Sequence, residues 1–247
     1  MRRTQALILA SLFGLLAVTV HSVGVPQSNA KRVKLATLEW PPYTTQSLEG
    51  AGPITSLVRR TLISAGYTPK IEFYPWARVV RMASSGESEI EGYFPEYYAE
   101  DISNTFIFSE AIGGGWLIFV ERKDKPIPWN TLGDLAPYTI GVVQDYVNTE
   151  DFDNAVASGV LRVEAVSTDS QNLRKLLAGR IDLAVIDELV FLHLLNTDAS
   201  LSKGHQRLQI NAHKLEYKQL YLCLRRTAEN EKRMRSFNQA LKQIRPK

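Results

Sequence analysis

The sequence predicts an α/β protein built as two similar lobes, and three observations support that prediction. Short apolar runs typical of β-strands alternate with segments whose apolar residues recur at helical spacing, which indicates α/β units. The alternation pauses at residues 123–128, which are rich in charge and proline, and then starts again. Residues 82–90 and 176–183, on either side of that linker, share one order: helix, glycine, acid, strand. This echo favours two lobes built alike.

Strands and helices are expected along both halves of the chain. Strands are predicted near residues 34–38, 70–74, 90–94, 116–121, 138–143, 163–166, 181–186 and 217–224. Helices are predicted near residues 53–66, 76–85, 169–179 and 188–195, and at the C-terminus, where Met234, Phe237, Leu241 and Ile244 recur at helical spacing. Pro53 is expected to open the first helix and Asp169 to cap the third. The glycines at 113–115 are expected to allow a close approach next to strand 116–121.

The N-terminus has the layout of a secretory signal peptide. Arg2 and Arg3 precede an apolar run over residues 6–20, and Ser28-Asn29-Ala30 has the small-x-small form of a cleavage site. The run of about 15 residues is shorter than the roughly 20 that span a bilayer, which favours removal over a retained anchor. Removal of residues 1–30 would leave a mature chain that we expect to be soluble, periplasmic and monomeric.

The composition argues against several classes of partner and cofactor. The precursor has 29 basic and 26 acidic residues, and its leader holds two Arg and no acid, so the mature chain carries 27 basic residues against 26 acidic ones. That near balance argues against nucleic acid or an anionic membrane as the main partner. Cys223 is the only cysteine, so no intramolecular disulfide can form, and no histidines of the mature chain have zinc-ligand spacing. We expect neither a metal nor a cofactor.

Six motifs follow one another over nearly the whole mature chain. They are Trp40-Pro41-Pro42-Tyr43, Tyr74-Pro-Trp-Ala-Arg78, Ser85-Gly-Glu-Ser-Glu-Ile90, Phe108-Ser109, Leu132-Gly-Asp-Leu135 with Thr139-Ile-Gly-Val142, and Leu177-Ala-Gly-Arg-Ile-Asp-Leu-Ala-Val-Ile-Asp187. Each is weak alone, but their order and spacing are specific. In these motifs the chain resembles the bacterial extracellular solute-binding proteins of family 3, which include the amino-acid-binding components of ABC importers.

The resemblance implies a two-lobed periplasmic-binding-protein-like (type II) fold. Residues 31–120 and 215–247 would form the first lobe, residues 121–214 would form the second, and two crossing strands would form the hinge. A small-molecule ligand would bind in the cleft between the lobes, because open α/β sheets bind ligands at the carboxyl ends of their strands. The lobes would close on the ligand by a hinge motion.

The resemblance fails at one functional position. Family members that bind α-amino acids hold the ligand carboxylate with an arginine in a Thr-x-x-Arg segment, whereas residues 92–101 of this chain contain no arginine. Arg78 is the candidate replacement, since a guanidinium forms two parallel bonds to a carboxylate. Otherwise the ligand has no α-carboxylate, and Arg78 is a solvated helix residue.

Three acids are candidates for binding a cationic group. Asp187 matches the acid that family members use for the ligand ammonium, and the neighbouring Glu188 is its nearest substitute. An acid in this place also caps the following helix in many proteins, which is the competing interpretation. Glu96 lies in the altered segment and would hold a cationic group or be a solvated loop acid.

Aromatic side chains at or next to the strand ends are expected to face the cleft, where rings stack on a ligand or attract a cation. They are Trp40, Tyr43, Trp76, Tyr93, Phe94, Tyr97, Trp116 and Tyr146. Packing in the core is the competing interpretation for some of them. Gln144, with Tyr146, occupies the place of a short polar loop that touches the ligand in the family.

The leading function from these inferences is capture of a small polar ligand, such as an amino-acid-like compound, an amine or a small organic acid, for an inner-membrane ABC permease. No catalytic residue is expected. One alternative is an enzyme on the same fold that is similar to the cyclohexadienyl dehydratases, with Glu96 or Glu188 as its acid. The other is a ligand-sensing protein that docks on a membrane receptor.

Overall fold

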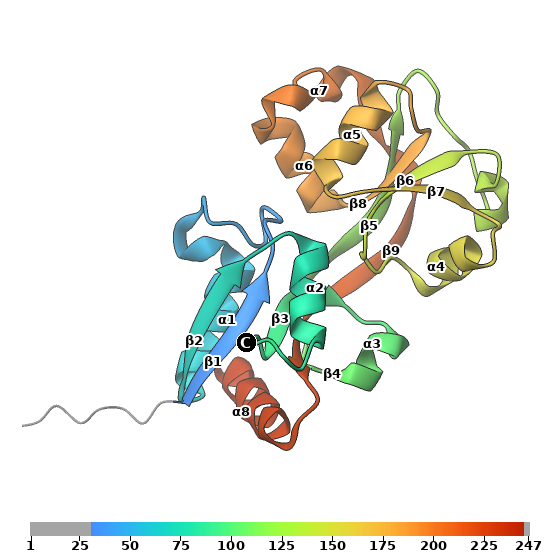
Figure 1. The fold of residues 1–247 in the computed structure, drawn as a ribbon. Coiled ribbons are helices and arrows are strands. Elements are labelled where there is room, and N and C mark those ends of the chain that lie inside the picture. Colours follow the sequence, from blue (N-terminus) through green and yellow to red (C-terminus); the bar gives the residue numbers. More distant parts are fainter. Residues whose placement is uncertain (1–30, 245–247) are drawn as a thin grey trace, which may run out of the picture.

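The computed structural model describes residues 31–244, which form two α/β lobes (Figure 1). This confirms the predicted fold class. The predicted signal peptide, residues 1–30, lies outside the described residues. Between residues 31 and 244, no helix combines the length and the apolar character needed to cross a bilayer.

Lobe 1, at the lower left of Figure 1, combines the N-terminal strands with the C-terminal helix. Its elements are β1 (Lys31–Thr37), η1 (Glu49–Ala51), α1 (Pro53–Ser64), β2 (Tyr67–Phe73), α2 (Trp76–Ser84), β3 (Gly92–Tyr97), α3 (Glu100–Thr105), β4 (Phe106–Phe108) and α8 (Ala228–Ile244). Strand β1 pairs in parallel with both β2 and β3. This parallel core, covered by helices, is the arrangement that α/β alternation predicts.

Lobe 2 repeats the arrangement with the middle of the chain. Its elements are η2 (Leu132–Leu135), β6 (Thr139–Val143), α4 (Glu150–Ala157), β7 (Arg162–Val166), α5 (Asp169–Leu177), β8 (Leu183–Asp187), α6 (Glu188–Thr197), η3 (Ala199–Leu201) and α7 (Gly204–Arg207). Here β6 is the central strand, parallel to β7 and β8.

Two long antiparallel strands run from one lobe into the other (Figure 1). They are β5 (Gly113–Arg122) and β9 (Leu208–Arg225). Strand β5 also pairs with β8, whereas β9 pairs with β3 and β4. One curled mixed sheet results, in the order β2-β1-β3-β9-β5-β8-β6-β7, with β4 on β9.

Local sequence explains where α1 begins and ends and which face of α8 is buried. Pro53 occupies the first turn of α1, where the missing N–H costs nothing, and Gly66 follows the helix with φ of 84°. The predicted spacing of Met234, Phe237 and Leu241 is confirmed, since all three are buried on α8. Helical spacing therefore located the face of this helix that packs on lobe 1.

One helix cap, one strand boundary and two short helices differ from the sequence predictions. Thr168, not Asp169, caps α5, because the Thr168 hydroxyl accepts a hydrogen bond from Gln171 N. Strand β9 begins at Leu208 rather than near residue 217, since its first half pairs with β5. The short polar helices α3 and α4 were not predicted, because 6 and 8 residues carry too little periodicity.

Candidate functional site

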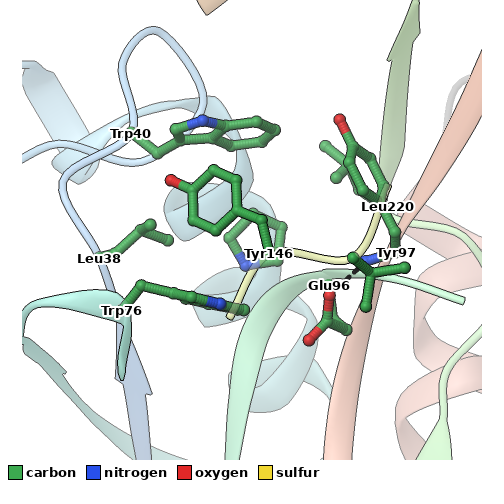
Figure 2. A pocket seen from close by; sticks show the side chains of 9 residues that line it. Leu38, Trp40, Trp76, Glu96, Tyr97, Tyr146 and Leu220 are labelled. Carbon is green, nitrogen blue, oxygen red and sulfur yellow. Dashed lines mark hydrogen bonds between the residues drawn. The ribbon is translucent and has the colours of Figure 1, made fainter. Parts of the chain in front are cut away.

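Aromatic side chains from both lobes meet where the strands end. The ring of Trp40 stacks on that of Tyr43 with centroids 4.8 Å apart, and it meets the Tyr97 ring edge-on at 6.2 Å. From lobe 2, Tyr146 lies between the indoles of Trp40 and Trp76, at 6.5 and 5.8 Å (Figure 2). The structure thus brings together five of the aromatic residues that the sequence placed at strand ends.

Hydrogen bonds also join the two lobes at this place. Trp76 Nε1 donates to the carbonyl oxygen of Asp145 at 2.8 Å. Tyr43 Oη donates to Asp187 Oδ2 at 3.1 Å, and Tyr97 Oη lies 3.4 Å from the same oxygen. Side chains of lobe 1 therefore contact lobe 2 directly.

Asp187 holds the start of α6 as well as this contact. Its Oδ1 accepts from the backbone N–H groups of Leu189 and Val190, at 2.8 and 3.2 Å, while Oδ2 faces the two tyrosines. Burial raises the pKa of Asp187 to about 6, and these donors oppose the rise. Capping, the competing interpretation, is observed. Contact of Asp187 with a ligand ammonium stays a prediction.

Replacing Asp187 by alanine is expected to lower the unfolding free energy by about 2 kcal/mol, because a helix cap is lost and two buried tyrosine hydroxyls lose their acceptor. The matched control is Thr168→Ala, which removes only a cap and should cost about 1 kcal/mol. Urea unfolding of both variants at pH 7 measures the difference. Equal losses would show that the tyrosine contacts contribute nothing.

Glu96 is a buried carboxyl on the lobe 1 side of the site. It is 4% exposed, accepts from Tyr93 Oη at 3.0 Å and from Tyr97 N at 2.8 Å, and faces a cavity of about 20 Å³. Burial raises its pKa to about 8, against the lowering effect of the Tyr93 hydroxyl. The cavity holds one water at most. Glu96 is thus neither a solvated loop acid nor next to space for a ligand in this conformation.

A larger groove of about 470 Å³ opens on the other side of Trp40 and Trp76. Its lobe 1 wall includes Glu39 and Tyr74, and its lobe 2 wall includes Tyr146 and the first turn of α5. Pockets for small molecules in proteins have volumes from about 300 to 1,000 Å³. The groove is therefore large enough for a small ligand held by both lobes.

Asp169, at the N-terminus of α5, lines this groove. Its side chain is 6% exposed, and burial raises its pKa to about 7. The Trp40 indole N–H lies close enough to oppose that rise, yet forms no hydrogen bond with residues 31–244. Sequence reasoning missed Asp169 as a site residue by assigning it to the cap. The sequence signal that could have identified it is the preceding Thr168: if threonine caps the helix, the Asp169 side chain is not needed as the cap.

Comparisons with known proteins identify the fold. No family model matches the chain, and no curated protein matches it. Several solved structures match, and one is a histidine kinase sensor domain with similarity to periplasmic binding proteins, with a TM-score of 0.73 and 17% identity over 87% of this chain and 90% of that one. The chain has the type 2 periplasmic-binding-protein fold. This confirms the resemblance in fold that the motifs predicted.

Two further structures with this fold were solved with a ligand. An ancestral arginine-binding protein bound to arginine has a TM-score of 0.70 and 16% identity, covering 86% of this chain and 92% of its own. The GluR0 ligand-binding core from Nostoc punctiforme in complex with L-glutamate has a TM-score of 0.68 and 17% identity, with the same coverage. At these identities the likeness shows the fold alone.

Several other predicted residues of this periplasmic-binding-protein fold line neither the small cavity at Glu96 nor the interlobe groove. Arg78 is exposed and places its guanidinium 4.6 Å from the Tyr74 ring centroid. Phe94 is fully buried, Gln144 is exposed, and Glu188 pairs with a lysine, Lys214, at 2.6 Å. Their contact with a ligand stays a prediction.

Trp116 and Tyr93 also take different places from the central cluster. Trp116 is 41% exposed on β5 and packs on Tyr217, with Lys214 over its ring. Tyr93 is buried, meets Trp76 edge-on at 5.5 Å and donates a hydrogen bond from its hydroxyl to the carboxyl of Glu96. Tyr93 is therefore a positioning residue for Glu96, and Trp116 belongs to the outer surface of the crossing strands.

Proposed function

We propose that this chain is a periplasmic solute-binding protein that captures a small polar ligand between its lobes and delivers it to an ABC permease. The observation that carries the proposal is the interlobe groove, where a buried carboxyl, Asp169, lies among aromatic rings supplied by both lobes. Export through the predicted signal peptide at residues 1–30 accounts for the compartment. No step of chemistry is needed for this function.

Hinge closure is the motion we assign to the fold. The boundaries that we propose for the lobes, at residues 120/121 and 214/215, fall within β5 and β9, so only two strands need to bend. The contacts of Trp76 with Asp145 and of Tyr43 with Asp187, which this structure contains, would break when the lobes open and form again on closure. They support closure because each joins a lobe 1 side chain to lobe 2.

A ligand-sensing role is the second candidate. The likeness to a histidine kinase sensor domain favours it, since that protein uses the same fold. The two roles differ in the partner: an ABC permease for transport, a membrane receptor for sensing. Crosslinking of the full chain in its host membrane, followed by identification of the partner, separates them.

A thermal-shift screen of residues 31–247 against amino acids, amines and small organic acids tests the proposal. A ligand at a hundredfold excess over its Kd should stabilise by about 2.7 kcal/mol, which raises Tm by roughly 7 °C for a domain of this size. Small-angle scattering should show a smaller radius of gyration with ligand than without it. Turnover of prephenate without any binding shift would favour the dehydratase-like enzyme instead.

A further inference from the structure

The interlobe groove offers negative charge and no positive side chain. Glu39 and Asp169 are its acidic lining residues, and no lysine, arginine or histidine of residues 31–244 lines it. Arg78 touches the groove only indirectly, by packing on Tyr74. Lys218 pairs with Glu216 at 3.6 Å and lies outside the groove. The electrostatic field in the groove therefore favours a cation over an anion.

Asp169 has hydrogen-bonding capacity that the described chain leaves unused. Its side chain is 6% exposed, and the Trp40 indole N–H lies near its carboxyl without forming a hydrogen bond to any of residues 31–244. Thr168 serves as the cap of α5, and the nearby Ser170 hydroxyl donates to Asp198 instead. A buried carboxylate whose nearest donor forms no hydrogen bond with it is costly. A ligand with N–H donors would remove that cost.

The walls around Asp169 suit an organic cation rather than a metal ion. Trp40, Trp76 and Tyr146 present rings to the groove, and such rings attract a cation through their faces. Within residues 31–244, no three metal-ligating side chains of His, Cys, Asp or Glu gather at one point. The rings also supply apolar contact for carbon atoms next to the charged nitrogen.

We propose that the ligand is an organic ammonium ion without a carboxylate, whose N–H groups bond to Asp169 and whose carbon atoms pack against the Trp40, Trp76 and Tyr146 side chains that line the groove. This inference rests on the proposed binding function. It assigns to Asp169 the ammonium contact that the sequence resemblance gave to Asp187. The chain itself supplies hydrogen bonds to the carboxyl of Asp187, whereas the one donor near Asp169, the Trp40 indole N–H, forms no hydrogen bond.

Matched ligand pairs test the proposal. Calorimetry of residues 31–247 compares each amine with the amino acid that differs from it only by the α-carboxylate: histamine with histidine, agmatine with arginine, putrescine with ornithine, cadaverine with lysine, and tyramine with tyrosine. For at least one pair the amine is expected to bind at least tenfold more tightly. Asp169→Asn should weaken that amine about a hundredfold, since a buried charge loses its partner.

Two control variants locate the effect. Asp151→Asn removes the same charge from an exposed position of lobe 2 and should leave the amine Kd within about twofold. Arg78→Ala should also leave it within about twofold, because no carboxylate is bound. The Tm of each variant confirms that it folds.

Each other outcome overturns a stated claim. If amino acids or organic acids bind and no amine does, the binding function stands and the ammonium inference fails. If an amine binds but Asp169→Asn keeps full affinity, the assignment to Asp169 fails. If none of the compounds, nor any compound of the wider screen, binds, both the inference and the proposed function fail.

Discussion

The variant Glu96→Gln is expected to be more stable than the natural chain by about 4 kcal/mol at pH 8, and by only about 1 kcal/mol at pH 5. The reason is the burial of Glu96, which raises the pKa of its carboxyl from an ordinary value of 4.5 to about 8. The folded chain keeps a proton that the unfolded chain loses between these values. Stability from this group therefore falls as pH rises from about 5 to about 8.

Glutamine removes that pH dependence and keeps the contacts. Its amide oxygen can accept from Tyr97 N, and its amide group can donate to Tyr93 Oη, so the hydrogen bonds at 2.8 and 3.0 Å have counterparts. Asp169 and Asp187 also have raised pKa values and change stability in the same direction. The difference between the natural chain and the variant isolates Glu96.

Urea unfolding at half-unit steps from pH 5 to pH 8 measures this difference. Glu87→Gln, at an exposed position of the same lobe, is the control and should follow the natural chain at every pH. Parallel stability curves for the natural chain and Glu96→Gln would contradict the prediction, since they would mean that Glu96 is ionised in the folded protein at pH 5.

The fold could be predicted because its signals are local. Whether a segment is a strand or a helix follows from the period of its apolar residues, as the buried Met234, Phe237 and Leu241 of α8 illustrate. The length of β9 could not be predicted. Its first half, from Leu208, is a strand because β5 pairs with it, and the alternation of buried residues there is weak. Tertiary pairing decided that boundary.

The candidate site was predictable in part for a similar reason. Trp40, Tyr97 and Tyr146 follow or end strands, and the carboxyl ends of the strands of both lobes face each other, so their rings meet. Trp116 failed to join them because side chains alternate along β5: Leu117 is buried, and its neighbour points outward. Sequence alone does not say which of two faces a hinge strand turns to the site.

Asp169 shows most clearly why part of the candidate site could not be predicted from the sequence. Threonine and aspartate are both good helix caps, and adjacent residues 168 and 169 compete for one capping position. A register difference of one residue decides whether the carboxyl bonds to its own helix or faces the groove. In the structure Thr168 caps α5. The carboxyl of Asp169 is therefore available for a ligand, and the proposed ammonium contact is assigned to Asp169.

The second large effect is expected from Gly115→Ala. A methyl group on Gly115 would overlap both Asp187 Oδ2 and Tyr43 Oη, the two atoms whose hydrogen bond joins the lobes. This confirms the predicted close approach at the glycine run. Asp187 cannot move away freely, since its other oxygen holds the first turn of α6. Overlap in a packed site and loss of this bond together should cost about 3 kcal/mol.

Urea unfolding measures the loss for Gly115→Ala, with Gly86→Ala as the matched control. A methyl group at Gly86 would meet no atom within 4 Å, so that variant should change stability by less than about 0.5 kcal/mol. The double variant Gly115→Ala, Tyr43→Phe removes one of the two overlapping oxygens. It should therefore be no less stable than Gly115→Ala alone, although Tyr43→Phe by itself destabilises. Simple addition of the two losses would mean that the methyl group and the Tyr43 hydroxyl do not compete for the same space, and that another contact makes this glycine necessary.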